Sequence, residues 1–185
     1  GTFTAGTSLV KSTSTGAITL LSGTFTGASS FYNLEFAPNI SGGSIAYDGA
    51  VALTATNNFT IDPTGGANTL TYNLGGTNTI TGTLLIQPAA STNATLDTRP
   101  SSTDYSIVVG TVDIEARGTI DATSSASAFT VSGSWTNNGT FTDGTSTVTF
   151  NATSGTKILS GTLNGSSKFY NLSFNHFKIT FQANI

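Results

Sequence analysis

Apolar and polar residues alternate in short runs along the chain, and Gly, Asn or Asp separates one run from the next. Tyr32, Leu34 and Phe36, for example, alternate with Asn33 and Glu35, which puts the two kinds of side chain on opposite faces of a strand. Phe31 breaks this alternation and is expected at a corner. No apolar residues recur at the i, i+3, i+4, i+7 spacing of an amphipathic helix. The spacing predicts an all-β chain, with strands at residues 17–21, 31–36, 44–47, 50–55, 58–61, 69–74, 79–87, within 105–131 and at 178–181.

Two stretches add detail to this prediction. Residues 88–104 contain two prolines and a cluster of small polar side chains, which predicts a loop or an irregular corner. In residues 112–117 three apolar side chains alternate with three charged ones, in the order Val112, Asp113, Ile114, Glu115, Ala116 and Arg117. We expect a strand here whose charged side chains share the solvent face and compensate one another.

One stretch of the chain occurs twice. Residues 1–36 and 139–174 align without a gap at an offset of 138, and 20 of the 36 positions are identical. Both copies contain GTFT, GTS, LSGT and a FYNLxF phrase. Internal repeats are typical of solenoid and array architectures. We expect a single elongated domain over residues 1–185 that holds one 138-residue unit and the first part of another, so that both ends fall inside the pattern.

Two all-β architectures fit strands of this length, a β-sandwich and a β-solenoid of the parallel β-helix type. Turns occur at short and even intervals, and phrases such as GTFT, GTLL and GTID return along the chain. In a solenoid, equivalent strands of successive turns lie above one another, so Thr, Ser and Asn side chains can form hydrogen-bonded ladders. The sequence therefore favours the solenoid, with the sandwich as the alternative.

The composition narrows the classes of function. Only 8% of the residues are charged and the net charge is −3, whereas ordinary domains are about 25% charged. The six Lys and Arg residues are scattered, which excludes a basic patch for nucleic acid or a membrane surface. No apolar run is long enough to span a membrane. The absence of Cys excludes disulfides and thiolate metal sites, and a chain that also lacks Met suits an oxidising extracellular location.

A longer phrase carries a more specific signal. Residues 132–174 read SGSWTNNGTFTDGTSTVTFNATSGTKILSGTLNGSSKFYNLSF. This phrase resembles a motif of very large bacterial and archaeal surface proteins that are described as β-strand-repeat or adhesin-like proteins. The resemblance covers both 36-residue copies well and the region between them loosely. It implies a parallel β-helix array, a cell-surface or filament location and a structural or adhesive role, with no catalytic residues to transfer to this chain.

Candidates for catalysis are few. A nucleophilic site needs a general base beside its Ser or Thr, and the only histidine, His176, is better interpreted as a surface or turn residue. Solenoid enzymes that cleave polysaccharides use paired carboxylates, for which Asp113, Glu115 and Asp121 are the candidates. We expect no enzymatic activity and no cofactor.

Three further alternatives concern binding. Calcium in the turns at Asp62 or Asp143 is weakly supported, because neither turn has the acidic spacing of a calcium loop. Thr-x-Thr pairs could form a flat face for ice or a crystalline polysaccharide, although they recur at no fixed interval. These pairs are Thr2/Thr4, Thr24/Thr26, Thr54/Thr56, Thr69/Thr71, Thr79/Thr81 and Thr140/Thr142. A carbohydrate-binding module needs an exposed aromatic row, for which the candidates are Tyr47, Tyr72, Tyr105 and Trp135.

Asn-x-Ser/Thr sequences are frequent. Each is an acceptor for N-glycosylation if the source glycosylates its surface proteins. The abundance of Asn, Ser and Thr makes chance occurrence the competing explanation. The asparagines are Asn39, Asn58, Asn93, Asn138, Asn151, Asn164 and Asn171.

We expect a structural extracellular protein, a subunit or repeat segment of a surface filament, sheath or surface layer. The alternative is an adhesin stalk or carbohydrate-binding module; a polysaccharide-degrading enzyme or an ice-binding protein is less favoured. The expected partner is another copy or tandem repeat, with surface polysaccharide as a further candidate. A solenoid leaves unpaired strand edges that a neighbour can cover. The edges expected to join are Gly1, Thr2, Phe3 and Thr4 at one end, and Ile179, Phe181 and Ile185 at the other.

Leu34 and Leu172 occupy the same position in the two copies of the repeat. Both alternate with polar neighbours, so we expect both side chains to face the core. Replacing either by alanine is then expected to cost about 2–5 kcal/mol of stability.

Overall fold

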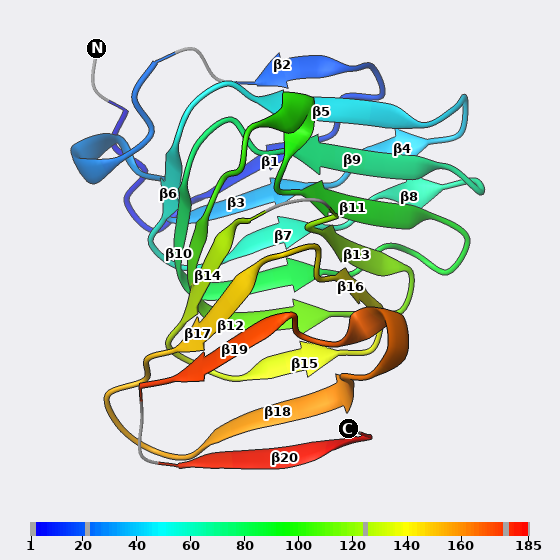
Figure 1. Cartoon of the computed structure of the whole chain (residues 1–185). Coiled ribbons are helices and arrows are strands. Elements are labelled where there is room, and N and C mark those ends of the chain that lie inside the picture. The colour runs from blue at the N-terminus through cyan, green and yellow to red at the C-terminus, as the bar shows by residue number, and fades with distance from the viewer. Residues whose placement is uncertain (1–2, 21–22, 124–125, 176–177, 185) are drawn as a thin grey trace.

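The computed structural model describes residues 3–20, 23–123, 126–175 and 178–184. This part of the chain coils into a β-solenoid of about 7 turns. Successive turns stack through parallel strand pairs, and the first and last turns lie at opposite ends of the coil (Figure 1). Parallel stacking confirms the predicted solenoid and excludes the β-sandwich, which is built from antiparallel sheets.

Each turn passes through three strand positions, which form three faces of the coil. The first face contains β6 (Leu53–Ala55), the first part of β10 (Asn78–Ile86), the first part of β12 (Ile107–Ile114), β14 (Ala128–Val131), β17 (Thr147–Phe150) and β19 (Asn171–Phe174). The second face contains β1 (Leu9–Ser12), β3 (Asn33–Phe36), β7 (Phe59–Ile61), the remainders of β10 and β12, β15 (Trp135–Asn137), β18 (Lys157–Thr162) and β20 (Ile179–Asn184). The third face contains β2 (Ile18–Leu20), β5 (Ile45–Gly49), β9 (Thr69–Asn73), β11 (Asn93–Asp97), β13 (Gly118–Asp121) and β16 (Thr140–Thr142).

Short elements complete the coil at its corners. The two-residue strands β4 (Asn39–Ile40) and β8 (Thr64–Gly65) pair with each other. The helical segments of the described residues are single 3-10 turns, η1 (Gly27–Ser29), η2 (Pro100–Ser102) and η3 (Gly165–Ser167). None of the helices in the described part of the chain is long and apolar enough to cross a membrane.

Glycine allows β10 and β12 to bend from the first face to the second. Their pairing shifts register between Ile80 and Thr83, where the strands turn the corner. A Cβ atom on Gly110 would lie 2.3 Å from the carbonyl oxygen of Thr81, and one on Gly133 would lie 2.5 Å from the carbonyl oxygen of Gly110. Only glycine therefore fits where the backbones of successive turns meet at this corner.

The core consists of columns of inward side chains from equivalent strands. On the second face the in-register column contains Leu34, Phe59, Leu84, Val112, Trp135 and Leu159. On the third face it contains Tyr47, Tyr72, Leu96, Ile120 and Phe141. All of these side chains are buried. Because each strand contributes alternate residues to the same continuous core, the coil needs no second layer to bury its apolar face.

Most predicted strands are present. Leu34 and Phe36 are buried as expected, Tyr32 is half-buried, and Phe31 pairs with Ala55 at a corner. The predicted loop at residues 88–104 was wrong in part, because it contains β11. Ala94 and Leu96 of that strand face the core. The two prolines flank the strand and do not interrupt it, so they were no evidence against it.

The predicted strand at residues 112–117 also needs correction. β12 ends at Ile114, and the chain turns towards the third face. Arg117 has a φ of 69°, which is incompatible with a strand, and Ala116 is exposed. Asp113, Glu115 and Arg117 therefore do not share one strand face, because the corner separates them.

The two copies of the repeat fold alike locally but occupy different faces. β1 pairs with β3 in the register Leu9 to Asn33, and β17 pairs with β19 in the equivalent register Thr147 to Asn171. The turns η1 and η3 also fall at equivalent positions. However, β3 continues the second face through β7, whereas β17 and β19 continue the first face from β14. One sequence phrase thus serves two faces of the coil.

Candidate functional site

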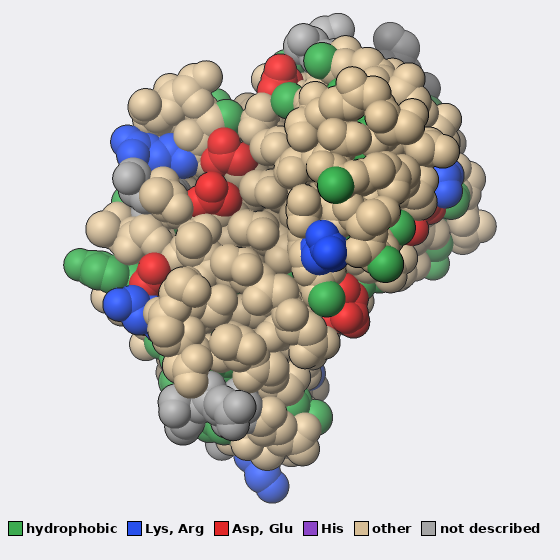
Figure 2. All heavy atoms as spheres, turned by 90° about the vertical axis from the view of Figure 1, so that its right-hand side faces the viewer, with side chains coloured by type: hydrophobic (Ala, Val, Ile, Leu, Met, Phe, Trp, Pro, Cys, Tyr) green, Lys and Arg blue, Asp and Glu red, His purple; other side chains and the backbone are tan. Residues whose placement is uncertain are grey.

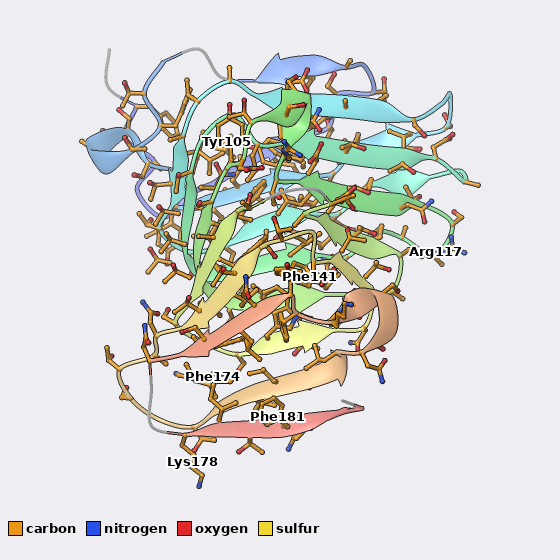
Figure 3. All side chains as sticks on the ribbon, in the orientation of Figure 1. Tyr105, Arg117, Phe141, Phe174, Lys178 and Phe181 are labelled. Atoms are coloured by element: carbon orange, nitrogen blue, oxygen red, sulfur yellow. The ribbon has the colours of Figure 1, made fainter. Side chains whose placement is uncertain are left out.

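The three carboxylates considered for catalysis lie on different parts of the coil. Asp113 belongs to β12, Glu115 lies in the following turn, and Asp121 ends β13 on the third face. Burial, and then the negative charge of Glu115, raise the pKa of Asp113. The register partner of Asp121 is Asp97 of β11. The structure therefore does not bring the three candidates together in one cleft. Arg117 projects from the side of the coil (Figure 3).

The other single-residue candidates do not form a site. His176 lies outside the described residues. Asp62 follows β7, where burial raises its pKa most and Glu35 raises it further. Asp143 follows β16 in a turn that leads to β17. Among the residues that the structure describes, no group of three or more His, Cys, Asp or Glu side chains could hold a metal ion.

The outer side of the third face carries two columns of polar side chains. The register of its strands stacks Thr71, Thr95, Thr119 and Thr140. A parallel column contains Asp48, Asn73, Asp97, Asp121 and Thr142. Hydrogen bonds link neighbours within the second column: Asn73 Nδ2 donates to Asp48 Oδ1 (2.6 Å), and Thr142 Oγ1 donates to Asp121 Oδ1 (3.0 Å). Sequence reasoning missed this second column, because residues 88–104 were expected to form a loop.

The pKa of Asp97 is raised in this column. Burial is the largest cause, the neighbouring Asp121 adds to it, and a hydrogen bond from the backbone N–H of Arg99 to Oδ1 (2.8 Å) opposes it. Asp62 and Asp113 shift in the same direction, also mainly through burial. The folded chain therefore holds protons on these carboxylates more tightly than the unfolded chain does.

This shift predicts that mild acid stabilises the fold. A carboxyl group whose pKa is raised in the folded chain contributes its full stabilisation below its unfolded pKa, which is 3.8 for Asp. This contribution is lost as the pH rises through the folded pKa. Urea unfolding should therefore give a higher free energy of unfolding at about pH 4 than at about pH 7. Asp97→Asn should reduce this difference, because the amide does not titrate. Its oxygen can still accept the hydrogen bond from the Arg99 N–H, so the local structure is kept. Stability that rises from acid to neutral pH would contradict the assignment.

The Thr-x-Thr pairs do not form one lattice. Thr54 and Thr79 are register partners on the first face, whereas Thr71 and Thr140 stand in a column on the third face. Thr2 lies outside the described residues, and Thr24 and Thr26 precede η1. The array expected of a flat face for ice or a crystalline polysaccharide is therefore divided between separate sides of the coil.

The four aromatic candidates for a carbohydrate-binding surface do not form an exposed row. Tyr47, Tyr72 and Trp135 are 0% exposed, because they belong to the inward columns. Burial raises the pKa of Tyr72 to about 12, against a smaller opposing effect of its hydrogen bond with Asn78. Tyr105 is half-buried beside the loop that contains η2 (Figure 3). Three of the four candidates, Tyr47, Tyr72 and Trp135, are therefore core residues and do not provide a stacking surface for sugars.

The glycosylation candidates differ in accessibility. Asn58 is half-buried, and its Oδ1 accepts the backbone N–H of Thr83 in the next turn (3.0 Å). Asn93 is half-buried at the start of β11. Five are exposed on the side or the end of the coil: Asn39, Asn138, Asn151, Asn164 and Asn171.

Four large apolar side chains are exposed on the last described turn of the coil. Its exposed fractions are 58% for Tyr170, 38% for Leu172, 41% for Phe174 and 46% for Phe181. We call these four residues the C-terminal apolar surface. Phe174 and Phe181 meet edge to face with ring centroids 6.3 Å apart (Figure 3). Three of these residues, Tyr170, Leu172 and Phe174, were missed by sequence reasoning, and Leu172 is exposed against expectation.

The first turn also exposes apolar side chains. Phe3 is 39% exposed and Leu9 is 51% exposed, whereas Val10 is half-buried. Of the other expected edge residues, Thr4 is exposed and Ile179 is half-buried in β20. Gly1, Thr2 and Ile185 lie outside the described residues. Apolar side chains are thus exposed at both ends of the coil. The side seen in Figure 2 consists mainly of uncharged polar side chains and backbone, with scattered apolar and charged side chains.

Comparison of the chain with protein-family models, with curated proteins and with solved structures found no match. The parallel β-solenoid and the apolar side chains exposed at its ends are therefore the features that bear on function.

Proposed function

We propose that this chain is a structural segment of an extracellular surface assembly, in which solenoid segments are joined end to end. The observation that carries the proposal is the apolar end of the coil. The inward columns of the first and second faces run through the molecule and emerge at Leu172 and Phe181. Repeat proteins that end in solution carry terminal turns with a polar outer face, and an exposed apolar patch marks an interaction site.

The stacking of the turns suits a load-bearing role. Besides the parallel ladders, polar side chains connect successive turns to one another. Asn33 Oδ1 accepts the N–H of Asn58 (3.2 Å), and Ser134 Oγ accepts the N–H of Ile158 (3.1 Å). Such bonds satisfy backbone groups and tie each turn to the next. Separating the turns would require breaking many hydrogen bonds together.

The chemical character of the side surface supports an extracellular location. Charge is sparse, Cys and Met are absent, and exposed sequons such as Asn138 and Asn151 are accessible for glycans. The resemblance of residues 132–174 to adhesin-like β-strand-repeat proteins points to the same location. A sugar-binding role has no comparable support, because Tyr47, Tyr72 and Trp135 are buried.

Surface labelling tests the proposal. An antibody raised against the recombinant chain should label intact, unpermeabilised source cells, and external protease should remove the label. Label that appears only after permeabilisation would overturn the proposal. The intact mass of the chain isolated from the source would show in addition whether the exposed sequons carry glycans.

A further inference from the structure

We propose that the C-terminal apolar surface binds the first turn of a second copy of this chain, with β19 pairing in parallel with β1 of the next copy. This inference rests on the proposed function and specifies its partner and its contact. It follows from the repeat, from the free strand edges and from the distribution of charge along the coil.

The repeat provides an internal comparison. In the first copy, the strand Asn33-Leu34-Glu35-Phe36 lies between β1 and β7, and Leu34 and Phe36 are 3% and 1% exposed. In the second copy, the equivalent strand β19 pairs with β17 and, within the described residues, with no strand on its other side. Its Leu172 and Phe174 are 38% and 41% exposed. The same motif is therefore covered on both sides in one copy and on one side in the other.

β1 has the features required of the missing cover. It pairs on one side with β3, the NLxF strand of the first copy, and in the described part of the chain its other edge is free. β19 presents the same NLxF pattern, and its free edge is the one through which β3 pairs with β7. A parallel contact between this edge and the free edge of β1 in another copy would continue the ladder as β7 does for β3, and with Leu9 opposite Asn171 it would cover Leu172 with Val10.

The two ends also match in apolar character. The last turn exposes Leu172, Phe174 and Phe181, and the first turn exposes Phe3, whose ring lies 5.6 Å from that of Phe31. Stacking one end on the other would remove these groups from water. Burial of apolar surface is the main driving force for such association.

Charge disfavours a contact between two C-terminal ends. Residues 140–185 contain Lys157, Lys168 and Lys178 against Asp143, a formal charge of +2, whereas in the first turn Lys11 is paired with Glu35 (Nζ to Oε1, 2.6 Å). Lys178 points away from the body at the end of the coil (Figure 3). Two C-terminal ends would therefore bring like charges together, whereas the paired charges of the first turn add no net charge to a contact between a C-terminal end and an N-terminal end. Because a head-to-tail contact uses two different surfaces, it builds an open filament and not a closed dimer.

Two exposed substitutions test the contact. Wild-type chain should associate progressively at micromolar concentrations, as measured by sedimentation velocity. Phe3→Asp removes the first-turn surface and Leu172→Asp removes the last-turn surface, so each should weaken association roughly tenfold or more. Val108→Asp is the matched control, because Val108 is 41% exposed on the side of the coil. That variant should associate like wild type, and circular dichroism checks that all three variants remain folded.

Mixing the two end variants decides the polarity. The Phe3→Asp chain keeps its last-turn surface and the Leu172→Asp chain keeps its first-turn surface, so an equimolar mixture should form dimers and stop there. A mixture that stays monomeric while wild type associates would overturn the head-to-tail contact. Wild type that stays monomeric at these concentrations would overturn the partner but not the surface location, which the antibody experiment tests separately.

Engineered cysteines test the strand pairing, since the chain has no Cys of its own. Adjacent strands place paired residues about 4.7–4.9 Å apart, within the Cα separation that a disulfide spans. A chain with Leu9→Cys and Asn171→Cys should form a ladder of disulfide-linked oligomers on oxidation. A chain with Leu9→Cys and Val108→Cys should not. Association without the Leu9–Asn171 link would overturn the β19–β1 pairing.

Discussion

Replacing Trp135 by alanine should lower the free energy of unfolding by about 3–5 kcal/mol. Trp135 is 0% exposed in the middle of the second-face column, between Val112 and Leu159. Its ring makes edge-to-face contacts with Phe141 and Phe169, at centroid distances of 5.1 and 5.3 Å. Alanine would leave a cavity that the neighbouring turns cannot close, because their backbones are fixed by ladders on both sides. Urea unfolding followed by circular dichroism measures the loss.

Trp135→Phe is the matched control. The indole Nε1–H is buried and makes no hydrogen bond to any described residue. A buried donor without a partner costs about 1–3 kcal/mol, so phenylalanine gives up contact area but also removes this penalty. Trp135→Phe should therefore be much less damaging than Trp135→Ala. Equal losses in the two variants would mean that the indole nitrogen has a partner and that the contact area of the ring contributes little.

The sequence predicted the local structure of the coil well. Alternation at two-residue spacing correctly assigned Leu34, Phe36, Val112 and Ile114 to the core, because every strand of a solenoid has one inward and one outward side. The repeated phrases correctly favoured stacked turns over a sandwich. Prolines misled the prediction of β11, since Pro88 and Pro100 stand outside the strand and leave its hydrogen bonds intact.

Relations between turns were harder to predict. The two repeat copies lie on different faces, because five turns of the second face take 125 residues, from Leu34 to Leu159, whereas the copies are 138 residues apart. The alternation within strands does not show how many residues each corner contains. It therefore could not predict which face of the coil each strand occupies. For the same reason, alternation marks Leu172 as inward but does not say whether another turn covers it.

Leu34→Ala and Leu172→Ala should therefore differ strongly in stability, although the sequence alone predicted equal effects. Leu34 is 3% exposed between two strands, so its truncation should lower the free energy of unfolding by about 2–5 kcal/mol. Leu172 is 38% exposed on the last strand of its face, so its truncation should cost less than about 1 kcal/mol in the monomer. Chemical unfolding of both variants in the Phe3→Asp background, which suppresses the proposed stacking, measures the difference.

The same pair of variants links stability to assembly. Without the Phe3→Asp substitution, the first turn of the next copy would cover Leu172. The loss of unfolding free energy caused by Leu172→Ala should then grow with protein concentration, because a contact between copies stabilises the folded chain by mass action. The cost of Leu34→Ala should not depend on concentration, since β3 is covered within its own chain. A Leu172→Ala effect as large as that of Leu34→Ala in the dilute monomer would mean that another segment of the same chain covers β19, which would remove the basis for the stacking contact.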